Sequence, residues 1–423
     1  MTSSKLEKLA VVYAEGSASL LTIKAASIGI CQIVVLFDEE CSENDKKQIK
    51  LLKKHLVSYD ISKLDVEEVV EILKKENVKG VVTFSEYKLR ITAELCEKMN
   101  FIGHTLENVE VLTDKYKQRE SLAKDSVNVV RYAILNKDNY KNRYEKVGFP
   151  AILKPRVGAG SKWTKKVSSL DELSTALDDF PENIEYILEE FLEGNPSFKG
   201  KYFGDYVSVE SIHQKGLSKS VCITAKLPLT ENFAETGMFI PHPFSKKLEQ
   251  EILEVEEKAI KALGITEGIT HTEIKLTKDG PRIIEVNGRL GGYVSEIIKR
   301  GTGIDLVKIA LMIALGKQVD MNLNVGKMSK VIYEIFLESP SVKQAVLYSI
   351  NGLDEVKKME HIVHVEIKRG IGSVFDYRNG TENNIGVVYG DADNFDQFEN
   401  IINFVRKTIT PKFYSRGSEE NYE

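Results

Sequence analysis

The chain has 423 residues, of which 42% are hydrophobic and 29% are charged, and its formal net charge is −5 at pH 7. A chain of this length is too long for one ordinary hydrophobic core, so about two to four subdomains are expected. The slightly acidic balance, with lysines interspersed among acids, argues against nucleic acid as the main partner.

The four cysteines are widely spread and form no CxxC pair, which is typical of ordinary thiols in a reducing compartment: Cys31, Cys41, Cys96 and Cys222. No signal peptide is visible, and no apolar stretch is long enough to span a bilayer. The sequence therefore predicts a cytoplasmic protein that has no membrane partner.

The first part of the chain alternates short apolar strands with amphipathic helices. Strands are predicted at Leu9–Tyr13, Gln32–Phe37 and Gly80–Phe84. Buried strands that alternate with helices indicate a parallel α/β layer. The turn over residues 16–19 could hold a phosphate, but it lacks GxGxxG spacing, so we favour a scaffold without a nucleotide of its own.

Two lysines come next at positions that are typical of anion binding, one at a helix start and one before a glycine loop. A polar helix is predicted to open at Lys115, where a lysine is unfavourable for the helix dipole unless an anion lies nearby; a solvated lysine is the alternative. Lys154 ends the strand 147–155 and precedes a small-residue loop flanked by cations. In this loop Gly158 and Gly160 leave backbone N–H groups free to bind anionic oxygens, although the spacing is neither GxGxxG nor Walker-type.

The next segments frame this loop. A strand over residues 186–194 ends in an acid-rich connector, whose edge could meet an adenine, with Glu189 nearby. Residues 205–212 and 220–226 alternate cleanly and predict neighbouring antiparallel strands. Residues 231–244 do not alternate, so we predict a loop there, either over a site or simply packed.

A hairpin with an Asp-Gly turn is predicted over Thr272–Arg289. Glu285 and Asn287 are two residues apart and share a face, and Glu273 comes opposite Glu285 when the hairpin closes. Three oxygen donors, two of them anionic, suit a hard cation such as Mg²⁺. A surface hairpin whose charges face water is the alternative; the upstream lysines and glycine loop favour the metal–phosphate site.

This ordered set of two lysines, a glycine loop, an acidic connector and a Glu…Glu-x-Asn-x-Arg hairpin resembles the ATP-grasp superfamily of carboxylate–amine ligases. The resemblance covers roughly residues 5 to 330. Within the superfamily, residues 270–275 and 285–292 look most like bacterial L-amino acid ligases, which form dipeptides, often in antibiotic biosynthesis.

The resemblance implies an ATP-grasp fold of mixed α/β and α+β class. It implies a Rossmann-like N-terminal domain (1–110), a first ATP-grasp subdomain with the lysines and the glycine loop (111–225) and a second one with the hairpin (226–328). From residue 329 the pattern changes to short alternating strands, which predicts a small C-terminal α+β subdomain (329–423).

The resemblance also implies residue roles. The catalytic residue would be Arg289, which meets the acyl phosphate. ATP would be bound by Lys115, Lys154, Gly158, Gly160, Ser161, Glu189, Glu190, Phe191, Leu192 and, at the ribose, Asp205. Mg²⁺, with Mn²⁺ as the alternative, would be held by Glu273, Glu285 and Asn287. The amino acid substrates would be contacted by Glu210, Met238, His242, Gly291 and Gly292. Related dipeptide ligases can carry a histidine where Met238 aligns here, so substrate choice is expected to differ.

The expected activity is ATP-dependent ligation of two L-amino acids through an aminoacyl phosphate, releasing ADP and phosphate. Two alternatives remain: an ATP-grasp ligase that acts on a different carboxylate in cofactor or nucleotide biosynthesis, and a nucleotide-binding regulatory protein without turnover. The identity of the amino acids and the oligomeric state stay open, with a homodimer as the candidate assembly.

Overall fold

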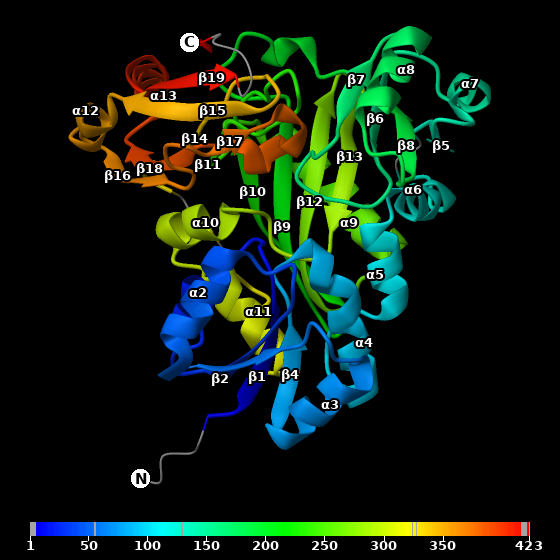
Figure 1. The fold of residues 1–423 in the computed structure, drawn as a ribbon, viewed down its shortest axis with the longest axis vertical. Helices are drawn as coiled ribbons and strands as arrows, with labels where there is room; N and C mark the ends of the chain where they lie inside the picture. The colour runs from blue at the N-terminus through cyan, green and yellow to red at the C-terminus, as the bar shows by residue number, and fades with distance from the viewer. Residues whose placement is uncertain are drawn as a thin grey trace.

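The computed structural model describes residues 6–54, 56–127, 130–323, 325, 326, 328–415, 421 and 422. Residues 1–5, where a leader sequence would begin, lie outside the described part of the chain. No helix within that part combines the length and the apolar character that crossing a bilayer requires. Figure 1 shows an N-terminal α/β unit at one end of the molecule and long antiparallel strands at its centre.

The N-terminal unit is a sheet of four parallel strands in the order β3-β2-β1-β4, which confirms the predicted parallel layer. Its strands are β1 (Lys8–Tyr13), β2 (Gln32–Phe37), β3 (Val57–Asp60) and β4 (Val78–Val82). Its helices are α1 (Leu20–Ala26), α2 (Glu43–Leu51), α3 (Val66–Lys75) and α4 (Leu89–Met99).

Strand β1 is apolar from Leu9 onward because both faces of the sheet are covered. Leu9 and Val11 belong to the core that also contains α11 (Leu306–Ala314), whereas Ala10 and Val12 pack in a second core with Val69 of α3. Helix α11 comes from a distant part of the chain, so it joins the N-terminal unit to the rest of the molecule.

Helices α5 (Leu106–Thr113) and α6 (Lys115–Lys124) lead into a small antiparallel sheet in the order β5-β8-β6-β7. These strands are β5 (Tyr132–Leu135), β6 (Ala151–Pro155), β7 (Lys165–Val167) and β8 (Tyr186–Glu190). The unit also contains α7 (Tyr140–Arg143) and α8 (Leu170–Asp179), and leucines of α8 pack in the same core as β6 and β8.

The central sheet has eight strands in the order β13-β12-β9-β10-β11-β14-β18-β16, and all of its neighbours are antiparallel. Five strands precede residue 329: β9 (Tyr206–Gln214), β10 (Leu217–Lys226), β11 (Gly237–Ile240), β12 (Gly268–Thr277) and β13 (Gly280–Asn287). Three follow it: β14 (Val331–Leu337), β16 (Ile362–Ile367) and β18 (Gly386–Ala392). The helices inserted between strands β11 and β14 are α9 (Lys246–Ala262), α10 (Val294–Thr302) and α11.

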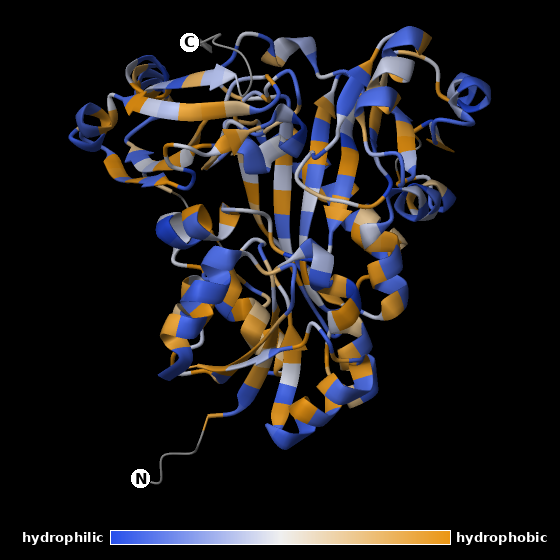
Figure 2. Ribbon diagram, in the orientation of Figure 1, coloured by the Kyte–Doolittle hydropathy of each residue, from blue (hydrophilic) through white to orange (hydrophobic). Residues whose placement is uncertain are grey.

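One face of this sheet, called the functional face below, carries a row of mostly polar side chains, because residues opposite each other on neighbouring strands project the same way. Along the long strands, hydrophobic and polar residues alternate visibly (Figure 2). From strand to strand, the register places on one face Glu285, Glu273, Ser208, Thr224, Lys226, Met238, Glu334 and Tyr389.

The expectation of a loop is wrong for Gly237–Ile240, which form strand β11 between β10 and β14. Met238 and Ile240 pack in one core and Phe239 in another, so this strand is buried on both sides and shows no alternation. A four-residue apolar run carries no periodicity that separates a strand from a packed loop.

The remaining strands form a fourth sheet in the order β17-β15-β19-β20. They are β15 (Ala345–Asn351), β17 (Val374–Phe375), β19 (Thr410–Ser415) and β20 (Asn421–Tyr422), accompanied by α12 (Leu353–Lys357) and α13 (Phe395–Thr408). The proposed domain boundaries stay a prediction. All four cysteines are buried and free, as expected of ordinary thiols.

Candidate active site

A cavity of about 1290 Å³ lies where the N-terminal unit, the small sheet and the functional face of the central sheet meet. It is lined by most of the residues that the sequence singles out: Lys115, Lys154, Gly158, Gly160, Ser161, Glu189, Glu190, Phe191, Leu192, Glu273, Glu285, Asn287, Arg289 and Gly292. Segments more than 170 residues apart in the sequence, from Lys115 to Gly292, thus share one site.

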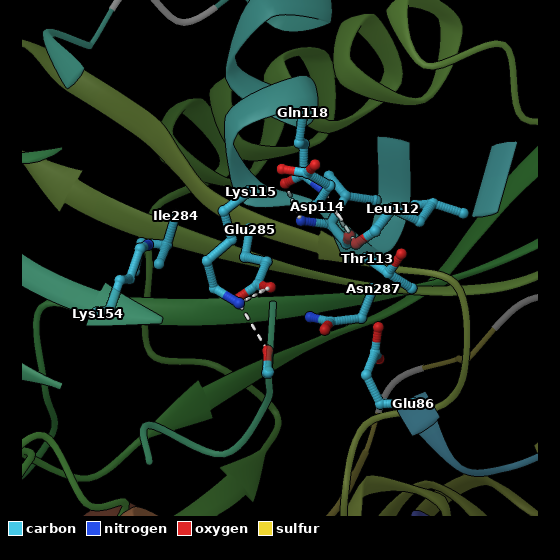
Figure 3. A network of polar contacts seen from close by, with 12 residues as sticks. Glu86, Leu112, Thr113, Asp114, Lys115, Gln118, Lys154, Ile284, Glu285 and Asn287 are labelled. Atoms are coloured by element: carbon cyan, nitrogen blue, oxygen red, sulfur yellow. Dashed lines mark hydrogen bonds and ion pairs between the residues drawn. The ribbon is translucent and has the colours of Figure 1, made fainter. Parts of the chain in front are cut away.

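The hairpin closes in the register that the sequence predicts, with Glu273 directly opposite Glu285 and His271 opposite Asn287. Figure 3 shows the side chain of Lys115 directed toward the Glu285 carboxylate. Lys115 Nζ lies 3.0 Å from Glu285 Oε1 and donates to the carbonyl oxygen of Gly158 at 2.6 Å. Burial opposes the charge on Lys115, but Glu285 raises its pKa, so the lysine is held as a cation.

The donor set fits a divalent cation. Glu273 and Glu285 supply two carboxylates and Asn287 an amide oxygen, all at one end of the hairpin and all lining the cavity. Burial would raise the pKa of Glu273, but His271, Lys226 and Arg289 together lower it to about 2. This carboxylate is therefore ionised and ready to act as a ligand at neutral pH.

The sequence analysis missed His271, which lies between the carboxylates of Glu273 and Glu210. Its Nδ1 lies 2.5 Å from Oε1 of the fully buried Glu210, and its Nε2 lies 3.5 Å from Glu273 Oε1. Burial alone would lower the pKa of His271, but the two carboxylates raise it to about 9. A Cβ on Gly291 would lie 2.3 Å from the His271 ring, so only glycine allows this approach. Strand alternation, which places His271 on the face of Glu273, was the available signal.

Lys154 is held by a second ion-pair group that includes Arg119, which the sequence analysis also missed. Glu189 accepts from Arg119 Nε at 2.8 Å and Nη2 at 3.0 Å, and its Oε2 lies 2.8 Å from Lys154 Nζ. Although burial opposes ionisation, the two cations lower the pKa of Glu189 to about 2. Arg119 also donates to the Ile283 and Ile284 carbonyl oxygens, which ties α6 to the hairpin. Glu189 therefore positions Lys154.

Arg289 is oriented by the N-terminal unit. Its Nε lies 3.0 Å from Oε2 of Glu86, and its Nη1 donates to the Leu290 carbonyl oxygen at 2.8 Å. Burial raises the pKa of the Glu86 carboxyl group, while Arg289 acts in the opposite direction. No local motif marks Glu86, because its partner lies about 200 residues away in the sequence, a separation that only the tertiary fold closes.

The glycine loop is held on its far side by the C-terminal part of the chain. Thr381 N donates to the Gly160 carbonyl oxygen at 3.0 Å, and Trp163 N donates to the Arg378 carbonyl oxygen at 2.9 Å. Lys162 forms an ion pair with Glu382. A 3-10 turn over Tyr377–Asn383 therefore packs on the loop that the sequence places over the phosphates.

Five candidates do not line the cavity: Asp205, Glu210, Met238, His242 and Gly291. Asp205 accepts from Lys275 Nζ at 2.6 Å, and Met238 is fully buried in a hydrophobic core. His242 stacks on Phe244 with a centroid distance of 5.4 Å. Glu210 and Gly291 lie one layer behind the site, against His271.

Comparison with known proteins gives matches at the level of sequence and of fold. A family model described as an ATP-grasp domain matches residues 147–297. Alanine–anticapsin ligase from Bacillus subtilis (strain 168) is 28% identical over 278 residues, which cover 60% of this chain. This chain spans 58% of the length of that relative.

Two further matches extend over more of the chain. The L-arginine-specific L-amino acid ligase of Bacillus subtilis is 22% identical over 362 residues, covering 82% of this chain and 84% of that protein. The crystal structure of an L-amino acid ligase from Bacillus licheniformis superimposes with a TM-score of 0.76 at 19% identity, covering 98% of this chain and 100% of that one. At this identity the structural likeness concerns the fold.

Proposed function

Because this chain is an ATP-grasp protein, in its domain over residues 147–297 and in its fold, we propose that it is an ATP-dependent ligase that joins two L-amino acids into a dipeptide. One observation carries the proposal: Glu273 faces Glu285 across the hairpin, in a cavity that also receives Lys115, Lys154 and Arg289. The names of two relatives, an L-arginine-specific L-amino acid ligase and an alanine–anticapsin ligase, support it.

The first step that we propose is transfer of the γ-phosphoryl group of ATP to the carboxylate of one amino acid. Amide formation in water is unfavourable, so the acid has to be activated before an amine can displace its oxygen. A bound Mg²⁺, held by Glu273, Glu285 and Asn287, would neutralise charge on the phosphates. Lys115 and Lys154 bring fixed positive charge to the same oxygens, and such preorganised charge lowers the barrier to phosphoryl transfer.

In the second step the amine of the other amino acid attacks the acyl phosphate, and phosphate leaves. Arg289, which pairs with Glu86, would stabilise the charge that develops on the carbonyl oxygen. The glycine loop would exclude water while the acyl phosphate exists, which suppresses its hydrolysis. The mechanism requires no nucleophilic side chain.

Phosphate release from ATP, measured with amino acids added singly and in pairs, tests the proposal. We expect a pair of amino acids to raise release well above the rate without amino acids, and mass spectrometry to detect a dipeptide. If no mixture raises release, the dipeptide-ligase proposal fails. Release with a different carboxylic acid would favour the other ligase alternative, whereas nucleotide binding without any release would favour the regulatory one.

A further inference from the structure

Beyond the hairpin, the functional face of the central sheet carries a buried carboxyl group, that of Glu334. Glu334 lies in the middle of β14, between Met238 on β11 and Tyr389 on β18, and it lines the cavity. Its side chain is fully buried, with 0% exposure. Within the described part of the chain, neither of its carboxyl oxygens has a hydrogen-bond partner. Buried polar groups are normally paired, so this one requires an explanation.

The neighbouring cations do not supply the missing partner, because each is bound elsewhere. Arg300, on α10 above Glu334, pairs with Glu296 through Nε at 2.7 Å and Nη2 at 3.0 Å. Further donors of Arg300 reach the backbone carbonyl oxygens of Gly390 and Tyr333. Lys226, one strand beyond Met238, lies 2.7 Å from Glu235.

Acidic side chains also lie near Glu334. Tyr389, opposite Glu334, donates its hydroxyl hydrogen to Glu366 at 2.9 Å rather than to Glu334. Burial, followed by the nearby Glu296, raises the pKa of Glu334 well above its ordinary value. An ionised Glu334 needs hydrogen-bond donors and a compensating positive charge. A cation that enters from the cavity would supply both.

We propose that Glu334 recognises the cationic side chain of an amino acid substrate, and that Glu296, which is paired with Arg300, adds negative charge near it. The inference rests on the proposed ligase function and specifies its substrate class: amino acids that end in an ammonium or guanidinium group. Apolar atoms of Val307, Ile367 and Tyr389 also line the cavity, and such surfaces suit the methylene stem of a long basic side chain.

The position of Glu334 indicates that it binds a cationic side chain of the substrate rather than the α-ammonium group. Three strands separate β12, which carries Glu273, from β14. At about 4.8 Å per strand, four steps place Glu334 about 19 Å from Glu273 along the sheet. The α-ammonium group of the activated amino acid is two bonds from its carboxyl carbon and stays beside the phosphate. A group that reaches Glu334 therefore belongs to a side chain that points away from the reacting carboxyl group.

Calorimetric binding titrations test the inference, with L-arginine and L-lysine compared with their uncharged counterparts L-citrulline and L-norleucine. The wild-type protein is expected to bind the cationic member of each pair at least about tenfold more tightly, as charged hydrogen bonds imply. The isosteric variant Glu334→Gln should remove most of this preference and leave binding of citrulline and norleucine unchanged. Glu296→Gln should weaken the same preference.

Glu338→Gln is the matched control, since this acid follows β14 but is exposed and does not line the cavity. Equal binding of cationic and uncharged amino acids by the wild-type protein would overturn the inference. So would equal weakening of both classes by Glu334→Gln in a protein with an unchanged circular dichroism spectrum.

The two proposals fail in different ways. If the protein prefers cationic amino acids but no mixture causes phosphate release, the ligase function is rejected and the recognition site is retained. Conversely, dipeptide formation from uncharged amino acids only, with no binding of arginine or lysine, would leave the ligase function and reject the recognition site.

Discussion

At the scale of single residues, the charged groups of the cavity are held in pairs by the protein itself. Lys115 is fixed by Glu285, Lys154 by Glu189, Arg289 by Glu86 and Glu273 by His271. Groups that are already oriented need little reorganisation when charge moves during a reaction, and this preorganisation is a large source of catalysis in enzymes.

The sequence predicts the part of this arrangement that follows from local geometry. Strand alternation and hairpin closure bring Glu273, Glu285 and Asn287 together, and the structure has that register. Arg119 and Glu86 could not be predicted in the same way, because their partners Glu189 and Arg289 are distant in the sequence. Only the packing of α6 and of the N-terminal unit brings these pairs into contact.

Glu285→Gln should abolish turnover while the protein stays folded. The substitution keeps the size of the side chain but removes an anionic metal ligand and the partner of Lys115. We expect phosphate release with amino acids to fall by more than about 100-fold. Asp279→Asn, an exposed acid in the turn of the same hairpin, should leave the rate nearly unchanged. Most of the activity surviving in Glu285→Gln would show that the hairpin is not the metal site.

Glu189→Gln should lower the free energy of unfolding and make that free energy less dependent on pH. The pKa of Glu189 is lowered from 4.5 to about 2 in the folded protein, so its contribution is present above about pH 4.5 and is lost as the pH falls toward 2. Removing this carboxylate leaves Arg119 and Lys154 buried without it, at a cost of about 3 kcal/mol near neutral pH.

Urea unfolding at several pH values measures this effect. The difference between wild type and Glu189→Gln should shrink as the pH falls from about 5 to 2. Glu185→Gln, which alters an exposed acid next to β8, serves as the control. A difference that stays constant with pH would contradict the role assigned to the ionised Glu189.

At the scale of elements, the glycine loop is held between two parts of the chain. Lys115 binds its Gly158 carbonyl oxygen on one side, and the turn Tyr377–Asn383 contacts Gly160 and Trp163 on the other. The sequence predicts a small-residue loop with free N–H groups, but not the segment that covers it. The covering turn follows the loop by more than 200 residues and carries no motif that points back to it.

Gly380→Ala should displace the glycine loop. Gly380 has φ of +59° and a Cβ there would lie 2.0 Å from the Gly160 carbonyl oxygen, so the loop or the turn has to move. We expect the specificity constant for ATP to fall about 10- to 100-fold, as a displacement of about 1 Å at a reacting group can cause.

Gly372→Ala is the matched control for this prediction. Gly372 also has a positive φ, of +88°, but no atom lies within 4 Å of its Cβ position, so it shares the positive φ without the clash. Equal loss of activity in the two variants would assign the effect to backbone strain rather than to the loop contact.

At the scale of the whole molecule, the N-terminal unit contributes to the site as well as supporting it. Its sheet shares a core with α11, and Glu86 extends from the end of the same unit to Arg289. The sequence predicts this unit as an α/β layer, and its fold is confirmed. The turn over residues 16–19, which the sequence offers as a possible phosphate site, lines the cavity. The contact of Glu86 with Arg289 had no signal in the sequence.

Glu86→Gln tests this coupling between units. Arg289 would lose its anionic partner and with it a fixed orientation, so kcat should fall about tenfold. The KM for ATP should change little, because Lys115 and Lys154 keep their own partners. Steady-state kinetics of phosphate release measure both constants, with Glu39→Gln, an exposed acid of the same unit, as control. An unchanged kcat would show that Glu86 does not position Arg289.

The place of β11 in the central sheet also has a consequence for biosynthesis. Its partner β10 has already been synthesised when Gly237–Ile240 leave the ribosome, but its other partner, β14, begins only at Val331. About 90 residues separate them, which at about 5–20 residues per second is a delay of about 5–18 s. During that time an apolar strand edge is open to pairing with another chain. Added holdase chaperones should therefore raise the yield of soluble, folded protein, measured after expression, by covering this nascent edge.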